Sequence, residues 1–253
     1  MTRVYSAVIA AAGRLDAQTA QRFGSDIKAL VRIGDKTLLA RLVDALRAVS
    51  EIGRINVVGP RAVHDSTLAV DEWIEERESG EANVVAALES ARGERTVFAA
   101  ADLPFVTGEA IAGLLRRVAD QTACAYPIFT RDEFEAAFPG GRSSFARLAD
   151  GEWTGGSVLV IDPRLVLRDQ ALLRRAFAAR KNLVALASLL GPKLALLYAT
   201  KRLRVADVEA RLGALAGGTF EAIRGADPAL AMDCDEEGDF AYSRAHGRGA
   251  PAP

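Results

Sequence analysis

The chain has 253 residues, half of them hydrophobic, which is enough for one large α/β domain or two small ones. Its 32 basic and 33 acidic side chains nearly cancel to a formal charge of -1, so no overall field marks a nucleic-acid-binding protein. Two cysteines and two histidines stand far apart, which argues against a structural zinc site or a disulfide framework and favours a reducing cytoplasm.

The first predicted element is an apolar run from Val8 to Ala12, which we interpret as a buried strand. Arg3 and the small residues near Ala12 also resemble a short secretory signal, but the basic region is minimal and we favour the strand. Gly13 ends the run, and a long polar stretch follows before Lys28. Such a loop can point backbone amides at phosphate oxygens, with the lysine adding charge. Because it lacks the Walker spacing, an ordinary surface loop is the simpler interpretation of this stretch alone.

Strand-like and helix-like segments then alternate through the first two-thirds of the chain. The apolar residues of 37–49 fall on one helical face, and continuous apolar runs bounded by glycine or proline indicate buried strands. The predicted strands cover residues 54–59, 95–102, 122–129 and 155–163, and the predicted helices cover residues 37–49, 82–92 and 108–120. This alternation predicts a largely parallel sheet covered on both faces, in one domain over residues 1–245. No stretch is long and apolar enough to predict a transmembrane segment.

Residues 168–217 differ from the rest because they are helical in pattern and strongly basic. We predict a helical insert that binds an anionic acceptor or supports a homodimer, and a merely solvated basic face is the simpler alternative. Few aromatic residues interleave with the basic ones, which argues against RNA binding. A late strand at 219–225, an acidic segment at 231–240 and a disordered tail at 246–253 are expected to follow.

Ligands of open parallel sheets bind beyond the carboxyl ends of the strands, so two strand exits are candidate sites. The first is the polar stretch after Gly13. The second is Asp102 in AAADLPF, which we expect at the end of a buried strand. A carboxylate there could bind Mg²⁺ together with phosphate oxygens and water. Taken alone, Asp102 could equally well cap the helix predicted near Gly108.

Together the two exits resemble the MobA-like NTP transferases, nucleotidyltransferases of the GT-A, nucleotide-diphospho-sugar-transferase fold. AAAG at 10–13 matches the first turn of the family, RFGSDIKAL matches its arginine, glycine and lysine, and ADLPFVT looks like its metal-bearing strand end. EWTGGSVLVIDP and AMDCDEEGDF resemble its later acceptor and metal motifs, in the same chain order. The resemblance implies a Rossmann-like, three-layer α/β/α fold with a mostly parallel mixed sheet.

The resemblance also implies a reaction and a set of site residues. A nucleoside monophosphate would pass from a nucleoside triphosphate, with GTP or CTP favoured, to a small phosphorylated acceptor, and pyrophosphate would leave. Arg22 and Lys28 would neutralise phosphate charge, and Asp102 and Asp235 would bind Mg²⁺. The implied nucleotide-binding residues are Ala11, Ala12, Gly13, Arg14, Lys28, Gly80, Asn83 and Asp102, and the implied acceptor-binding residues are Arg142, Gly155 and Gly156.

Several of these assignments have alternatives. The stretch before Arg22 is longer than in the family, so Arg14 could take its role. Asp233 could replace Asp235 as a metal ligand. We favour Asp235 because it lies closer to the helix that follows, as the metal ligand of the family does. Asn83 could instead be an ordinary helix cap.

Two alternative functions also stay open. A GT-A glycosyltransferase would use a nucleotide-sugar and a D-x-D metal motif, and residues 233–235 have that pattern, although much nearer the end of the sequence than in that class. It would release a nucleoside diphosphate instead of pyrophosphate. The lengthened loop and altered late motif would also suit a domain that binds nucleotide without turning it over. Independently of function, the simpler interpretation of Arg142 is a solvated loop.

Overall fold

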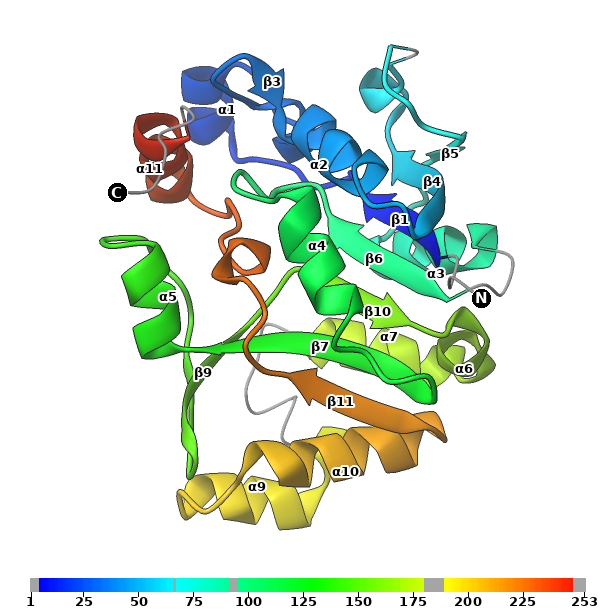
Figure 1. Cartoon of the computed structure of the whole chain (residues 1–253), viewed down its shortest axis with the longest axis vertical. Coiled ribbons are helices and arrows are strands. Elements are labelled where there is room, and N and C mark those ends of the chain that lie inside the picture. The colour runs from blue at the N-terminus through cyan, green and yellow to red at the C-terminus, as the bar shows by residue number, and fades with distance from the viewer. Residues whose placement is uncertain (1–4, 66, 92–94, 180–188, 248–253) are drawn as a thin grey trace.

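The computed structural model describes residues 5–65, 67–91, 95–179 and 189–247 (Figure 1). Within these residues nine strands form the central sheet, in the order β5-β4-β1-β6-β10-β7-β9-β8, with β11 paired to β7. The strands are β1 (Tyr5–Ala10), β4 (Ile52–Gly59), β5 (Glu72–Glu75), β6 (Thr96–Ala100), β7 (Thr122–Thr130), β8 (Ala146–Leu148), β9 (Gly151–Gly155), β10 (Val158–Ile161) and β11 (Thr219–Ile223). A separate hairpin joins β2 (Arg32–Ile33) to β3 (Lys36–Thr37).

The sheet is mixed and mostly parallel on the side that contains the chain's first strand. β1 pairs in parallel with β4 and β6, β5 pairs in parallel with β4, and β10 is the antiparallel strand between β6 and β7. Because β1 and β6 are parallel neighbours, their carboxyl ends meet at one edge of the sheet. The amide of Ala101 donates to the carbonyl of Ala10 at 3.1 Å, which joins the two strand exits. The predicted fold class is therefore confirmed.

Helices cover both faces of the sheet (Figure 1). α2 (Leu38–Arg47) and α4 (Gly108–Leu115) pack on one face, and α3 (Gly80–Ser90), α6 (Pro163–Arg168) and α7 (Gln170–Ala179) pack on the other. The first face buries Leu42, Leu46, Ile111 and Leu114 in the largest hydrophobic cluster. These helices include the three predicted at 37–49, 82–92 and 108–120. The remaining helical elements are α1 (Ala17–Phe23), α5 (Arg131–Ala137), α9 (Pro192–Ala199), α10 (Val205–Ala216), α11 (Glu237–His246) and the short turns η1 (Lys28–Leu30), η2 (Arg61–Val63) and η3 (Pro228–Leu230).

The polar stretch after the first strand is partly helical and not simply a loop. Asp16 caps α1, because its carboxylate accepts hydrogen bonds from the amides of Gln18 and Thr19, both at 3.0 Å. Gly24 ends the helix in the left-handed conformation, at φ +83°, which glycine adopts without strain. Asp16 and Gly24 are standard signals for the two ends of a helix. The segment between them is short and polar, so it has too few apolar residues to show a helical period.

The glycine pair at 155–156 also differs from its prediction. Gly155 ends β9, and β10 begins only at Val158, so the pair forms the connection between two strands and does not begin one. The amide of Gly156 donates to the carbonyl of Pro127 at 2.9 Å, and the amide of Ser157 donates to that of Leu230 at 2.7 Å. These bonds hold the connection against β7 and η3, where a continuous strand would not fit.

The described part of the basic region is helical, as predicted, with α7, α9 and α10 inside 168–217, while residues 180–188 lie outside the described residues. α10 packs along β11, the predicted late strand, and α9 packs beside α10 (Figure 1). The predicted tail is wrong at its first residue, because His246 belongs to α11 and its ring stacks on Tyr242 at 4.1 Å between centroids. Residues 248–253 lie outside the described residues.

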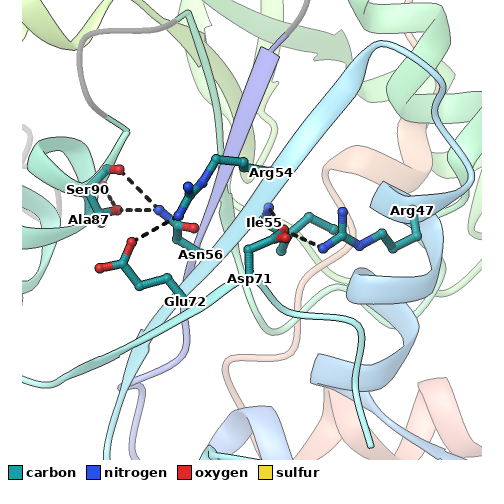
Figure 2. A network of polar contacts seen from close by, with 8 residues as sticks. All are labelled: Arg47, Arg54, Ile55, Asn56, Asp71, Glu72, Ala87 and Ser90. Carbon is teal, nitrogen blue, oxygen red and sulfur yellow. Dashed lines mark hydrogen bonds and ion pairs between the residues drawn. The ribbon is translucent and has the colours of Figure 1, made fainter. Parts of the chain in front are cut away.

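Polar contacts fix the edge strand β5, which sequence patterning did not predict (Figure 2). The carboxylate of Asp71 accepts the amide of Ile55 at 2.8 Å and the guanidinium of Arg47 at 2.5 Å. Arg54 donates to Glu72 at 3.3 Å. These contacts add polar links to the parallel pairing of β5 with β4, and Trp73 and Ile74 of β5 are partly buried against the hydrophobic clusters. No helix in the described ranges is long and apolar enough to cross a membrane.

Candidate functional site

After α1, the chain returns to the end of β1 at Lys28. The amide of Lys28 donates to the carbonyl of Gly13 at 3.0 Å, and Arg14 and Ile27 form an isolated antiparallel bridge beside it. A Cβ atom on Gly13 would lie 3.2 Å from Cδ of Lys28, which is tighter than most real contacts. Glycine at this turn therefore leaves room for the stem of the lysine to pass.

The ammonium group of Lys28 lies between two carboxylates. Its Nζ is 3.6 Å from Oδ2 of Asp102, and it also donates to Oδ1 of Asp235. The side chains of Lys28 and Asp102 are 14% and 17% exposed, whereas that of Asp235 is 56% exposed. The amide of Cys234 donates to the carbonyl of Asp102 at 3.0 Å, which ties the late acidic segment to the end of β6. The structure thus brings together three of the predicted residues from three distant segments.

Burial and charge set the protonation of this group. Burial raises the pKa of Asp102 to about 7, Lys28 opposes that rise, and the negative charges of Asp233 and Asp235 add to it. Burial alone would lower the pKa of Lys28, but the facing carboxylates, Asp102 foremost, raise it overall. Oδ1 of Asp102 is buried and has no hydrogen-bond partner among the described residues. An unsatisfied buried oxygen beside a charged lysine is costly for folding, which is typical of a functional position.

Asp233 adjoins the same group from the other side. Its Oδ2 accepts the hydroxyl of Ser157 at 3.0 Å, and burial raises its pKa. Burial also raises the pKa of Tyr126, and the charge of Asp233 adds to that rise. Sequence reasoning missed Ser157 and Tyr126. The position of Ser157, directly after the glycine pair, was the available signal.

The carboxylates suit a metal that is shared with a ligand. In the described part of the chain, no group of three or more His, Cys, Asp or Glu side chains is arranged to hold a metal ion by itself. Mg²⁺ usually takes only one or two protein carboxylates, alongside phosphate oxygens and water. The unsatisfied oxygen of Asp102 and the exposed carboxylate of Asp235 fit that mode of binding.

The two candidate arginines of the opening stretch point to different partners. Arg22, on α1, forms an ion pair with Glu237 at the start of α11. Arg14 donates to the carboxylate of Glu76 at 2.6 Å and to the carbonyl of Ala12 at 3.0 Å. Arg14 therefore braces the turn after β1, whereas Arg22 reaches the acidic segment that also carries Asp235.

The predicted base and ribose contacts lie at the start of α3. Ser79 caps this helix by accepting the amide of Ala82 at 3.2 Å, so Asn83 is not its cap. The buried Asn83 instead accepts the amide of Arg77 at 2.6 Å and fixes the loop that enters the helix. A Cβ on Gly80 would lie 2.6 Å from the ring of Phe177 on α7, so the basic insert contacts this helix end.

The predicted acceptor residues are spread over two segments. A Cβ on Gly155 would lie 1.7 Å from the hydroxyl of Tyr126, and one on Gly156 would lie 2.9 Å from the carbonyl of Leu230. Packing within the protein is therefore sufficient to explain both glycines. Arg142, in the chain between α5 and β8, lies 3.5 Å from Glu236.

A mostly parallel α/β sheet with a glycine turn, a lysine and two carboxylates beside its strand ends is the arrangement that the resemblance to the nucleotidyltransferases of the GT-A class implied. The model of the MobA-like NTP transferase domain family matches residues 7–214, and the chain belongs to this family. It is accordingly a nucleotidyltransferase. Asp233 and Asp235 lie beyond the matched range. Comparison with curated protein sequences found no match.

Solved structures of related fold support the assignment. A structure described as a hypothetical transferase from Thermus thermophilus is 32% identical, covers 94% of this chain and 99% of its own, and superposes with a TM-score of 0.81. A 2-C-methyl-D-erythritol 4-phosphate cytidylyltransferase from Thermus thermophilus is 20% identical over 97% of this chain and 99% of its own, with a TM-score of 0.55. A 4-diphosphocytidyl-2C-methyl-D-erythritol synthase from Anaerococcus prevotii is 12% identical over 97% and 96%, with a TM-score of 0.60. At these lower identities the last two show the fold alone.

Proposed function

We propose that the protein transfers a nucleoside monophosphate from a nucleoside triphosphate to a small anionic acceptor in a Mg²⁺-dependent reaction that releases pyrophosphate. The observation that carries the proposal is the position of Lys28 between Asp102 and Asp235 at the ends of β1 and β6. In such a transfer the protein contributes positioning and charge neutralisation more than covalent chemistry. No histidine base is needed.

Each residue of the group has a distinct task in this proposal. The ammonium of Lys28, held at the Gly13 turn, would move from the carboxylates to phosphate oxygens of the donor. Asp102 and Asp235 would hold Mg²⁺, which neutralises charge on the phosphates when it is bound. Ser157 orients the carboxylate of Asp233, which keeps that side chain beside the group. The acceptor would approach from the side of Arg142, whose guanidinium suits a phosphate.

We place this enzyme in the cytoplasm as part of the same proposal. Cys124 and Cys234 are free thiols, and burial raises the pKa of each to about 12. Thiols of this kind are unreactive, and the absence of a disulfide at both described cysteines suits a reducing compartment.

Nucleotide binding tests the proposal without knowledge of the acceptor. Thermal melting would be measured with ATP, GTP, CTP and UTP, each with and without Mg²⁺, on wild type, Asp102→Asn and Lys28→Met. The control is Lys36→Met, which removes a lysine from an exposed surface pair with Asp44. A ligand at a hundred times its dissociation constant stabilises by about 2.7 kcal/mol, or roughly 5–10 °C for a chain of this size.

We expect one triphosphate to give a Mg²⁺-dependent shift that the control retains and both site variants lose. Asp102→Asn should keep or raise the melting temperature of the free protein, because it removes a buried charge with an unsatisfied oxygen. A shift with a nucleotide-sugar but with no triphosphate would favour the glycosyltransferase alternative. Binding without pyrophosphate release across a panel of sugar and alcohol phosphates would favour the inactive domain.

A further inference from the structure

Three consecutive acidic residues beside the site each hold a basic side chain from a different segment. We call residues 235–237 the acidic segment. Asp235 pairs with Lys28, Glu236 with Arg142, and Glu237 with Arg22. The partners are Lys28 in η1, Arg142 in the chain after α5, and Arg22 in α1. Lys28 and Arg22 are predicted to contact the donor phosphates and Arg142 the anionic acceptor, so each of these basic residues already has a carboxylate in the free protein.

The backbone of the acidic segment is held in place by its own part of the chain. Oδ2 of the buried Asp239 accepts the amides of Asp235 and Glu236, at 3.1 and 2.8 Å. The ring of Phe240 is fully buried and packs on that of Phe23 at 5.1 Å between centroids. The side chains of Arg22 and Arg142 are 60% and 69% exposed, and those of their partners Glu237 and Glu236 are 34% and 72% exposed. The backbone of the acidic segment is therefore fixed, and the side chains of both pairs lie where a ligand can reach them.

The energetics allow an anionic ligand to take the place of the carboxylates. A guanidinium stays charged at every pH that the protein experiences, so each arginine can bind either a carboxylate or a phosphate. Exposed ion pairs contribute little, because solvent screens them and long side chains lose entropy in them. Phosphate oxygens accept two parallel hydrogen bonds from a guanidinium, which makes them the stronger partners. A polyphosphate can therefore take both arginines from the glutamates.

We propose that Glu236 and Glu237 are specificity-determining counter-charges that occupy Arg142 and Arg22 until a polyphosphate displaces them. This inference rests on the proposed function, because it assumes that the Lys28 group receives a triphosphate. The glutamates compete with anionic ligands for the arginines. A ligand therefore binds both arginines only if it displaces both carboxylates. The glutamates also recapture the arginines when the bound phosphate groups leave.

The test is a double-mutant cycle with inorganic tripolyphosphate as the probe, measured by calorimetry at low salt without Mg²⁺. Glu236→Gln with Glu237→Gln keeps the side-chain size and removes both counter-charges. We expect the dissociation constant for tripolyphosphate to fall about tenfold, since each exposed pair contributes a few-fold at most. The gain should disappear when Arg22→Gln and Arg142→Gln are added, because the freed arginines are its source.

A matched control separates this effect from net charge. Asp44→Asn with Glu72→Gln also removes two carboxylates, from exposed pairs with Lys36 and Arg54, and should leave the constant unchanged. Melting curves check that α11, which begins beside Glu236, stays folded in the test variant. Three results would overturn the inference: no gain, an equal gain in the control, or a gain that survives loss of the arginines. Wild-type protein that binds no nucleoside triphosphate with Mg²⁺ would instead remove the proposed function.

Discussion

Gly155→Ala should destabilise the protein through one contact, that with Tyr126. The new Cβ would lie 1.7 Å from Oη of Tyr126, 2.3 Å from its Cζ and 2.6 Å from its Cε1. Gly155 is not among the glycines with positive φ, so alanine can adopt its backbone conformation. The clash with the ring is therefore the main cost of the substitution.

The size of the effect follows from what must move. The hydroxyl oxygen and two ring carbons are below any real contact distance, so the whole Tyr126 ring has to leave its place beside Asp233. Overpacking in proteins costs about 1–3 kcal/mol, and a displaced aromatic ring belongs at the upper end. For a chain of this size about 3 kcal/mol lowers the melting temperature by roughly 6–12 °C.

The assay is a denaturant-unfolding cycle with Tyr126→Ala as the second change. Tyr126→Ala alone should cost about 2–4 kcal/mol from lost packing. In that background Gly155→Ala should cost nothing or stabilise slightly, because alanine loses less backbone entropy on folding. The expected coupling is therefore about 3 kcal/mol. Additivity within about 0.5 kcal/mol would show that Tyr126 does not require the glycine, and would return Gly155 to the acceptor role that the resemblance implied.

Two further predictions concern the framework of the site. Asp71→Asn should destabilise the β5 edge by about 1 kcal/mol at neutral pH. Burial alone would raise the pKa of Asp71, but the amide of Ile55 and the charge of Arg47 lower it overall, so its contribution is present above the ordinary aspartate pKa and is lost as the pH falls through the folded value. Urea unfolding at pH 7 and pH 3 should show a smaller difference between wild type and variant at pH 3 than at pH 7, and an equal difference at both would contradict the ion pair. Asp16→Ala removes the cap of α1, and amide hydrogen exchange should quicken across residues 17–23, most at Gln18, while β1 is unchanged; equal exchange in both proteins would mean that the cap is dispensable.

Elements with a strong hydrophobic pattern were predictable from the sequence. The helix at 37–49 and the strand at 54–59 were found because burial repeats with the period of each structure. α1 was missed because its seven residues are mostly polar and its stability comes from caps at both ends. β5 was missed because four residues at a sheet edge give too short an alternation. The glycine pair was misassigned because the tertiary contacts of Gly155 and Gly156 decide where the strand breaks.

The site was predictable at the level of which strand ends meet. Because parallel strands end at the same edge, the sequence predicts that the segments carrying Lys28 and Asp102 lie close together. The partners of Arg22 and Arg142 were not predictable, since charge pairing between distant segments leaves no periodic signal. Nor does a sequence pattern show which of Asp233 and Asp235 faces the lysine. In the structure Asp235 contacts it, and Asp233 accepts the hydroxyl of Ser157.

The bond from the amide of Cys234 to the carbonyl of Asp102 has a consequence for how the enzyme comes into being. It joins segments that are made at very different times during synthesis, and closing so long a loop costs entropy that local contacts cannot offset early. The sheet from β5 to β7 can assemble once β10, the strand between β6 and β7, has been made, while translation continues. Lys28 and Asp102 would then face each other without Asp235, and α1 would lack the partner that Phe240 supplies. A nascent chain therefore has the scaffold before it has the complete Lys28 group, and under the proposed function it would transfer no nucleotide until its late acidic residues have been made.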